Sequence, residues 1–188
     1  MTALLPTEIL EREHRFIEKV VAACAGAADE IGAGGAVDAA PLKRIVEFMR
    51  MYADKCHHGK EELLLFPALI AKGVPMTGCP IGALTAEHVQ GRRLVGGLVD
   101  SAGLLDSAGE EARKGILENL QGIHRLYPNH IWKEDYLLFP MTLKVMAQGD
   151  LEELRKKFES VDLSMGRDIL RGYEEFADEL ATRWKAAN

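Results

Sequence analysis

The chain has 188 residues, of which 47% are hydrophobic and 28% are charged, a composition typical of a globular protein with a sizeable core. The net charge of −6 and the dispersed lysines and arginines argue against binding to nucleic acid or to an anionic membrane surface. Three irregularly spaced cysteines do not suggest a disulfide framework, and no apolar run is long enough to span a bilayer. No secretory signal pattern opens the chain, so we expect a cytoplasmic protein.

Apolar residues recur at helical spacing along most of the chain, and no segment shows the alternation of a convincing β-strand. The first expected helix covers residues 7–30, with Thr7 as its N-cap, and ends in a glycine-rich loop. The second runs from the N-cap Asp38 to about residue 65. Phe66-Pro67 should then bend or end it, because proline lacks a backbone donor and clashes with the preceding turn.

The second half of the chain shows the same succession of helices bounded by proline and glycine. A third helix is expected over residues 80–107, with proline in its first turn. A fourth is expected over residues 109–138, kinked at Pro128, and it then meets a second Phe-Pro pair. A fifth helical stretch covers residues 151–186, with an interruption expected at residues 161–166.

Four main helices joined by short or moderate connections predict an all-α fold, an up-down-up-down four-helix bundle with an additional C-terminal helix packed across it. The length of the chain favours a single domain over residues 1–188. Within it, we expect the core bundle at about residues 8–147 and the C-terminal helical extension at about residues 150–187.

An internal repeat relates the two halves of the chain. His-His-Gly-Lys-Glu-Glu-Leu-Leu-Leu-Phe-Pro at residues 57–67 aligns without gaps on His-Ile-Trp-Lys-Glu-Asp-Tyr-Leu-Leu-Phe-Pro at residues 130–140, and seven of the eleven positions are identical. A Glu-His pair ending at His14 precedes the first segment by 43 residues, and a second pair ending at His88 precedes the other by 42. Each half therefore supplies one helix with a histidine and one helix with a histidine and a carboxylate.

The spacing within each repeat is typical of a metal site. Residues four apart on an α-helix share a face, so each His-x-x-x-Glu segment aims an imidazole and a carboxylate at the same volume. Helix bundles build metal sites from such inward side chains, and this donor set suits iron and similar transition metals. Two shared carboxylates would bridge two metals, and the imidazoles would fill terminal positions. The candidate metal ligands are His14, His57, Glu61, His88, His130 and Glu134.

The neighbours of these residues leave alternatives open. His58 is either a partner of Glu62 or a seventh, asymmetric ligand. Glu62 and Asp135 follow the two carboxylates, and they either face outward or orient the histidines. Tyr127 and Asp54 lie three residues before the repeat histidines, which favours a supporting role behind the ligands as much as ordinary packing or solvation.

The duplicated motif resembles the hemerythrin-like family, also called the HHE cation-binding domain, over about residues 8–145. This resemblance implies a four-helix bundle with a non-haem di-iron centre, in which the six candidate ligands hold two iron ions. Oxygen-carrying hemerythrins use an extra histidine from a His-x-x-x-His pair, but here Leu84 and Arg92 flank His88 at that spacing. This departure argues against simple reversible oxygen transport. Some relatives place a carboxylate beside the histidine that matches His57, where this chain has His58.

The sequence leaves two functions open for such a centre. One is the binding of oxygen, nitric oxide or peroxide, for sensing, iron handling or defence against oxidative and nitrosative stress. The other is an enzyme that reduces peroxide or nitric oxide, or donates iron to repair iron–sulfur centres. A metal-free helical interaction module is a third reading, which the repeat disfavours. A redox partner protein is expected for either of the first two functions, and the oligomeric state is not indicated.

Overall fold

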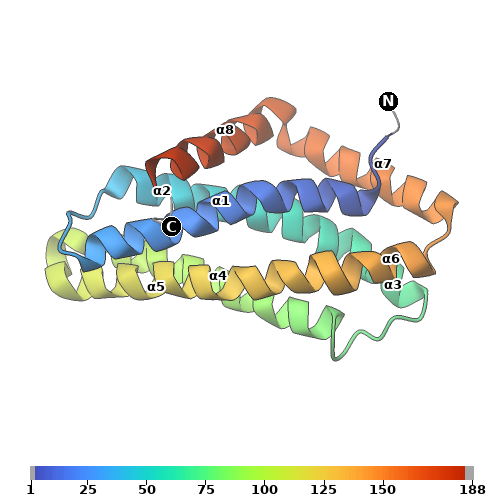
Figure 1. Cartoon of the computed structure of the whole chain (residues 1–188), viewed down its shortest axis with the longest axis horizontal. Coiled ribbons are helices and arrows are strands. Elements are labelled where there is room, and N and C mark those ends of the chain that lie inside the picture. The colour runs from blue at the N-terminus through green and yellow to red at the C-terminus, as the bar shows by residue number, and fades with distance from the viewer. Residues whose placement is uncertain (1–2, 185–188) are drawn as a thin grey trace.

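The computed structural model describes residues 3–184, and every regular element in that range is a helix (Figure 1). The α-helices are α1 (Pro6–Gly32), α2 (Ala39–Phe48), α3 (Phe66–Ala71), α4 (Ile81–Gly103), α5 (Leu105–Lys133), α6 (Phe139–Val145), α7 (Gln148–Met165) and α8 (Arg167–Arg183). The π-helical segments are η1 (Met49–His58), η2 (Glu61–Leu65) and η3 (Glu134–Leu138). The expected all-α class is confirmed, and none of the described helices has the length and apolar character needed to cross a membrane.

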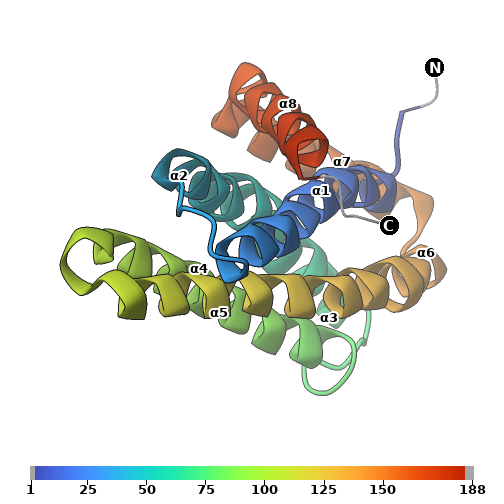
Figure 2. The same cartoon turned by 60° about the vertical axis from the view of Figure 1, so that its left-hand side comes forward.

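Four long rods form the bundle: α1, the run from α2 through α3, α4, and the run from α5 through α6 (Figure 1). α5 packs against both α1 and α4. α7 and α8 cover one side of the bundle, where both contact α1 and α7 also contacts η1 and η2 (Figure 2). The expected bundle with a C-terminal addition is confirmed. The addition is divided at Gly166, whose φ of 91° is a left-handed conformation that glycine adopts without strain.

The helix starts depend on local carboxylates. α1 begins at Pro6, and the Glu8 carboxylate accepts a hydrogen bond from the Leu5 backbone at 2.7 Å. Thr7 is therefore inside the first turn and is not the expected N-cap, because Pro6 needs no donor partner there. Asp38 caps α2 as expected, since its side chain accepts a hydrogen bond from the Ala40 backbone at 3.1 Å.

The two Phe-Pro pairs do not end their helices. Pro67 lies in the first turn of α3, directly after η2, and Pro140 lies in the first turn of α6, directly after η3. A wider π turn shifts the hydrogen-bond register ahead of each proline, which then occupies a position where its missing donor is not needed. The helices continue to Ala71 and Val145, so of the two outcomes expected at Phe66-Pro67, a bend or an end, the end was wrong.

α5 contains Pro128 in its interior and an irregularity nearer its start. α5 continues through Pro128, and its one residue with non-helical torsions is Gly109, at φ 41° and ψ −101°. The helix already begins at Leu105, ahead of this glycine. The helix start expected near residue 109 therefore coincides with the kink that separates residues 105–108 from the rest of α5.

A polar layer divides the hydrophobic core into two clusters. One cluster involves the C-terminal part of α1 and the part of α5 that precedes Glu134, and it includes Ile17, Ile45 and Ile123. The other lies toward the Phe-Pro pairs and includes Leu10 and Phe139. The candidate ligands fall between these clusters along each rod, so apolar side chains exclude water from both sides of the layer.

Candidate metal centre

The six residues expected as ligands lie together in the polar layer, and each is at most 3% exposed. Helical spacing turns each of them inward from its own rod. α1 carries His14, the run from α2 through α3 carries His57 and Glu61, α4 carries His88, and the run from α5 through α6 carries His130 and Glu134. All four rods of the bundle therefore contribute.

A first group consists of His14, His57, Glu61 and Glu134, whose potential ligand atoms lie within 4.8 Å of one another. Nε2 of His14 is 3.0 Å from Oε2 of Glu134 and 3.1 Å from Nε2 of His57. Imidazole and carboxylate donors converging on one buried point match the coordination preferences of divalent transition metals.

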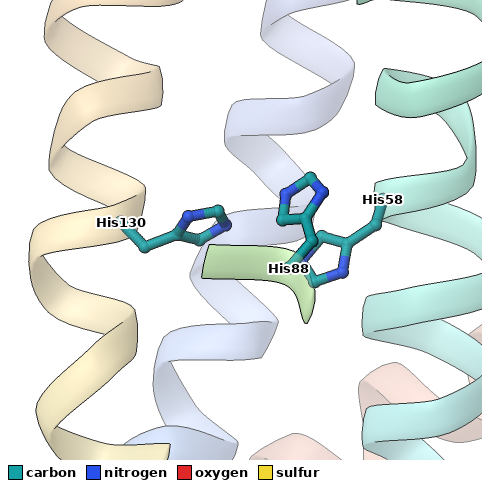
Figure 3. A group of neighbouring side chains, drawn as sticks. All are labelled: His58, His88 and His130. Carbon is teal, nitrogen blue, oxygen red and sulfur yellow. The ribbon is translucent and has the colours of Figure 1, made fainter. Parts of the chain in front are cut away.

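A second group consists of His58, His88 and His130, again with ligand atoms within 4.8 Å of one another. Figure 3 shows the three rings converging from different rods. The rings of His58 and His88 stack, with centroids 3.8 Å apart. His58 joins His57 in facing inward because both end the π-helical segment η1, in which each residue turns the chain less than in an α-helix.

The two carboxylates lie between the groups. Oε2 of Glu61 is 3.8 Å from Nε2 of His57 in the first group and 3.4 Å from Nε2 of His88 in the second. Oε1 of Glu134 is 3.3 Å from Nε2 of His130, while its other oxygen faces the first group. Each carboxylate thus approaches histidines of both groups, which is the placement of a bridging ligand.

Several potential ligand atoms of the centre have no hydrogen-bond partner in the described part of the protein. Both oxygens of Glu61, both oxygens of Glu134, and Nε2 of His88 and of His130 are buried without a hydrogen bond to any residue that the structure describes. Unpartnered buried polar atoms cost about 1–3 kcal/mol each, and more where they are charged. Metal cations would satisfy all of them at once, so the residues present fit a metal centre.

The electrostatics of the metal-free site are unfavourable for two carboxylates. Burial and the adjacent Glu134 carboxylate raise the pKa of Glu61 well above its usual value. Burial also acts to raise the pKa of Glu134, but the imidazoles of His130, His14 and His88 outweigh burial and hold that pKa well below its usual value. A divalent cation between these groups would allow both carboxylates to remain ionised.

A second layer of carboxylates orients the histidines, and one pair in it follows the repeat. Nδ1 of His57 donates to Glu13 at 3.0 Å, and Nδ1 of His130 donates to Glu87 at 3.1 Å. Each glutamate directly precedes the histidine of its own helix and reaches the histidine of another. Such bonds fix the tautomer that leaves Nε2 available to a metal.

The residues that follow Glu61 and Glu134 complete this layer. Nδ1 of His14 donates to Asp135 at 2.6 Å, and Nδ1 of His88 donates to Glu62 at 2.7 Å. Of the two expected roles for Glu62 and Asp135, the structure thus shows the orientation of histidines. Glu62 does not pair with His58, whose Nδ1 lies 3.2 Å from Asp54 instead.

A cation stands behind each of these carboxylates. The pairs are Lys60 with Glu13, Lys133 with Glu87, Arg15 with Asp135, and Arg92 with Glu62. Burial acts against the ionised form of Glu62, but His88 and Arg92 lower its pKa to about 2. Glu62 therefore stays charged and acceptor-only, which strengthens its hold on the His88 imidazole.

The sequence reasoning missed the roles of Glu13, Glu87, Lys60 and Lys133. Both lysines occupy identical positions of the repeat, and both glutamates belong to its Glu-His pairs, so the pattern contained the information. Lysine is almost never fully buried unless it is paired, which is why sequence alone gave no reason to place Lys60 inside. Lys60 is 0% exposed.

A pocket of about 220 Å³ opens beside the second group. His58, Tyr127, Gly91 and Arg92 are among the residues that line it. The Tyr127 ring lies edge-on to His130 with centroids 5.7 Å apart, and burial raises the pKa of its hydroxyl, which therefore remains a hydrogen-bond donor. Tyr127 and Asp54 thus line this pocket together with His58, and the Asp54 carboxylate lies 3.2 Å from Nδ1 of His58.

The sequence matches the model of a known protein family. A family model described as the hemerythrin HHE cation binding domain matches residues 5–142, which include both histidine groups and both carboxylates. Two mycobacterial relatives are "Uncharacterized protein Rv1995" of Mycobacterium tuberculosis and "Uncharacterized protein Mb2018" of Mycobacterium bovis. Each is 22% identical over 174 residues, a match that covers 93% of this chain and 67% of the relative. No solved structure matches the chain.

Proposed function

Because the chain belongs to the hemerythrin HHE cation-binding domain family, we propose that it holds two iron ions in a non-haem di-iron centre. The centre would bind oxygen, nitric oxide or peroxide. The observation that carries this proposal is the set of four buried carboxylate oxygens that lack hydrogen-bond partners among the described residues and lie among imidazole nitrogens. The proposed ligands are His14, His57, Glu61, His88, His130 and Glu134, with His58 as a seventh.

The charges of the site support two divalent ions. Two ferrous ions bring four positive charges, and Glu61 and Glu134 offset two of them. The remainder favours a small anion at the centre, which suits the binding of peroxide or of a reduced diatomic molecule. The second layer of carboxylates adds negative charge around the histidines. The paired lysines Lys60 and Lys133 reduce the repulsion between these carboxylates.

The proposed event is the approach of a small ligand through the pocket beside His58. When bound, the iron pair would supply open coordination positions and electrons. Tyr127 would present its hydroxyl toward an incoming ligand, while Asp54 holds Nδ1 of His58. The two apolar clusters keep bulk water away from both sides of the polar layer.

Sensing, iron handling or defence against oxidative and nitrosative stress is the role that we propose for this binding. The alternative is a di-iron enzyme that reduces peroxide or nitric oxide, or donates iron to repair iron–sulfur centres. The observation that favours the alternative is the protonated Tyr127 in the pocket, a group able to donate a hydrogen bond to a reacting ligand. Three free cysteines, two of them buried, fit a reducing cytoplasm, where a redox partner protein would serve either function.

Anaerobic reconstitution with ferrous iron tests the proposal. We expect two iron ions per chain and a strong loss of iron content when Glu61 and Glu134 are both replaced by alanine. A chain that holds one ion or none, or a double variant that retains full iron content, would contradict the centre. Spectroscopy then separates the two functions: a reversible spectral change with oxygen supports binding, whereas irreversible oxidation with turnover of peroxide supports an enzyme.

A further inference from the structure

A third cluster of potential ligands lies outside the centre. Glu13, Cys56 and Asp162 bring their acceptor atoms within 4.8 Å of one another. The ammonium group of Lys60 already occupies this cluster, because it contacts Glu13 and lies 2.5 Å from Oδ1 of Asp162. The cluster is therefore a buried ion network built around a lysine, and the lysine takes the place that a cation would otherwise fill.

This network connects the C-terminal extension to the first ligand group. Asp162 lies on α7, and its carboxylate binds Lys60. Lys60 binds the Glu13 carboxylate on α1, whose other oxygen accepts the hydrogen bond from Nδ1 of His57 at 3.0 Å. Cys56 adds a donor to Asp162 at 3.6 Å. Three consecutive contacts thus lead from α7 to a proposed iron ligand.

The other half of the repeat lacks this connection. Lys133 corresponds to Lys60 and binds Glu87, but no second carboxylate contacts it in the part of the chain that the structure describes. The side chain of Lys133 is 16% exposed, whereas that of Lys60 is 0% exposed. Of the two repeat lysines, Lys60 alone therefore binds a carboxylate of the C-terminal extension among the described residues, and that extension lies beyond residues 5–142 that match the family model.

We infer that Asp162 is a positioning residue for His57, through which α7 holds one of the two metal positions in place. An ammonium group fixed between two carboxylates cannot rotate freely, so it fixes the Glu13 carboxylate and hence the plane and tautomer of the imidazole. Without Asp162, the Lys60 ammonium group would keep only Glu13 as a partner and would be more mobile. The Glu13 carboxylate would then be held less firmly as well. This inference rests on the proposed metal centre.

The test uses the full chain loaded with cobalt(II), whose paramagnetism shifts the exchangeable Nδ1 protons of ligating histidines in the proton NMR spectrum. The His57 signal is identified by its displacement in Glu13→Gln. In Asp162→Asn we expect the His57 signal to move and to exchange faster with water, while the signals of His88 and His130 stay in place. The affinity for one of the two cobalt ions should fall about threefold to tenfold, less than when a direct partner of a ligand is lost.

Asp178→Asn is the matched control. Asp178 lies on α8 and pairs with Lys19 on α1 at 2.5 Å, so it also ties the extension to α1 but contacts nothing in the network. This variant should leave all histidine signals unchanged. Asp162→Glu, which keeps the charge and protects the fold, should displace the His57 signal less than Asp162→Asn does.

Two results would overturn the inference. One is a His57 signal that is unmoved in both Asp162 variants while two cobalt ions are bound. The other is an equal displacement of all histidine signals in Asp162→Asn and Asp178→Asn, which would indicate a general loosening of the extension. If the unmodified chain failed to take up two cobalt ions, the proposed metal centre itself would fail, which is a separate and recognisable outcome.

Discussion

Glu13 accepts a hydrogen bond from Nδ1 of His57 over 3.0 Å, although the two residues are 44 positions apart in the chain. The bond sets the tautomer of the imidazole, because a ring that donates from Nδ1 presents an unprotonated Nε2 to the centre. Glu87 forms the equivalent bond with His130 over 3.1 Å. In each half of the repeat, a glutamate on one helix therefore fixes the tautomer of a histidine on the next helix in the absence of a metal.

Replacing Glu13 with glutamine should weaken metal binding without removing a ligand. A neutral amide is a poorer acceptor than a carboxylate, so the imidazole becomes less basic and less well oriented. We expect the affinity for one metal ion to fall about tenfold to a hundredfold. Competition with a chromophoric chelator measures this loss, and Glu18→Gln on the exposed side of the same helix serves as the control. Equal affinities in the two variants would contradict the orienting role.

His58 should matter for only one of the two metal positions. Its ring belongs to the second group and is absent from the first, so His58→Ala should lower the affinity for one ion by at least about tenfold and spare the other. Added imidazole should restore part of the loss, since a pocket of about 220 Å³ adjoins the vacated space. Stepwise metal titration measures both effects.

The exposed His124 provides the control for that experiment, because His124→Ala changes a histidine that lies outside both groups. Two ions bound as tightly by His58→Ala as by the unmodified chain would show that His58 is not a ligand.

The two repeat lysines should differ in their contribution to stability. Lys60→Met leaves the buried Glu13 carboxylate and the partly buried Asp162 carboxylate without their shared cation, and the loss of one partner of a buried ion pair costs about 3–5 kcal/mol. Lys133→Met removes a partly exposed lysine with a single carboxylate partner, so solvent should limit its cost to about 1 kcal/mol. Urea unfolding of the metal-free variants measures both values. A similar loss in the two variants would mean that burial of Lys60 has no special weight.

The metal-free protein should lose stability as the pH falls below 6.5. Burial lowers the pKa of His57 and His58 well below the usual histidine value of about 6.5, so below that pH the unfolded chain binds protons that the folded chain does not. Each of the two histidines then costs up to about 1.4 kcal/mol for every pH unit. His14, whose pKa is raised to about 9, acts in the opposite sense, and its contribution is complete below 6.5 and is lost as the pH rises toward 9.

Urea midpoints at pH 7.5 and pH 5 would measure the acid-side slope. His58→Gln should reduce it by up to about 1.4 kcal/mol per pH unit, because a neutral side chain removes one proton-binding group while retaining polarity. Glu61, whose raised pKa acts in the opposite sense, is present in both proteins. A slope that is the same in this variant and in the unmodified chain would mean that His58 is protonated in the folded state.

Helical periodicity was sufficient to predict the all-α bundle, and the repeat was sufficient to predict the convergence of the six side chains. His57 and Glu61 share a helix face by spacing alone, and the second copy removes the coincidence. What spacing could not predict was the π-helical segment η1, which changes the angle between neighbouring residues and brings His58 beside His57. No composition pattern distinguishes that segment from α-helix.

The continuation of the helices past Pro67 and Pro140 was missed for a related reason. The sequence shows that a donor is missing, but it does not show that a wider turn has already shifted the hydrogen-bond register. Lys60 was missed because its partners lie on two other helices, at Glu13 and Asp162, and only the packed bundle brings them together.

The division of ligands between the halves has a consequence for how such a protein could arise. The first group takes His14, His57 and Glu61 from one half of the chain and Glu134 from the other. A polypeptide of half this length could complete a coordination sphere only by pairing with a twin. In the present chain, one polypeptide contains both halves and supplies all of these residues. Because the two halves belong to one chain, their sequences can differ, and they do differ where His58 in the first half corresponds to Ile131 in the second.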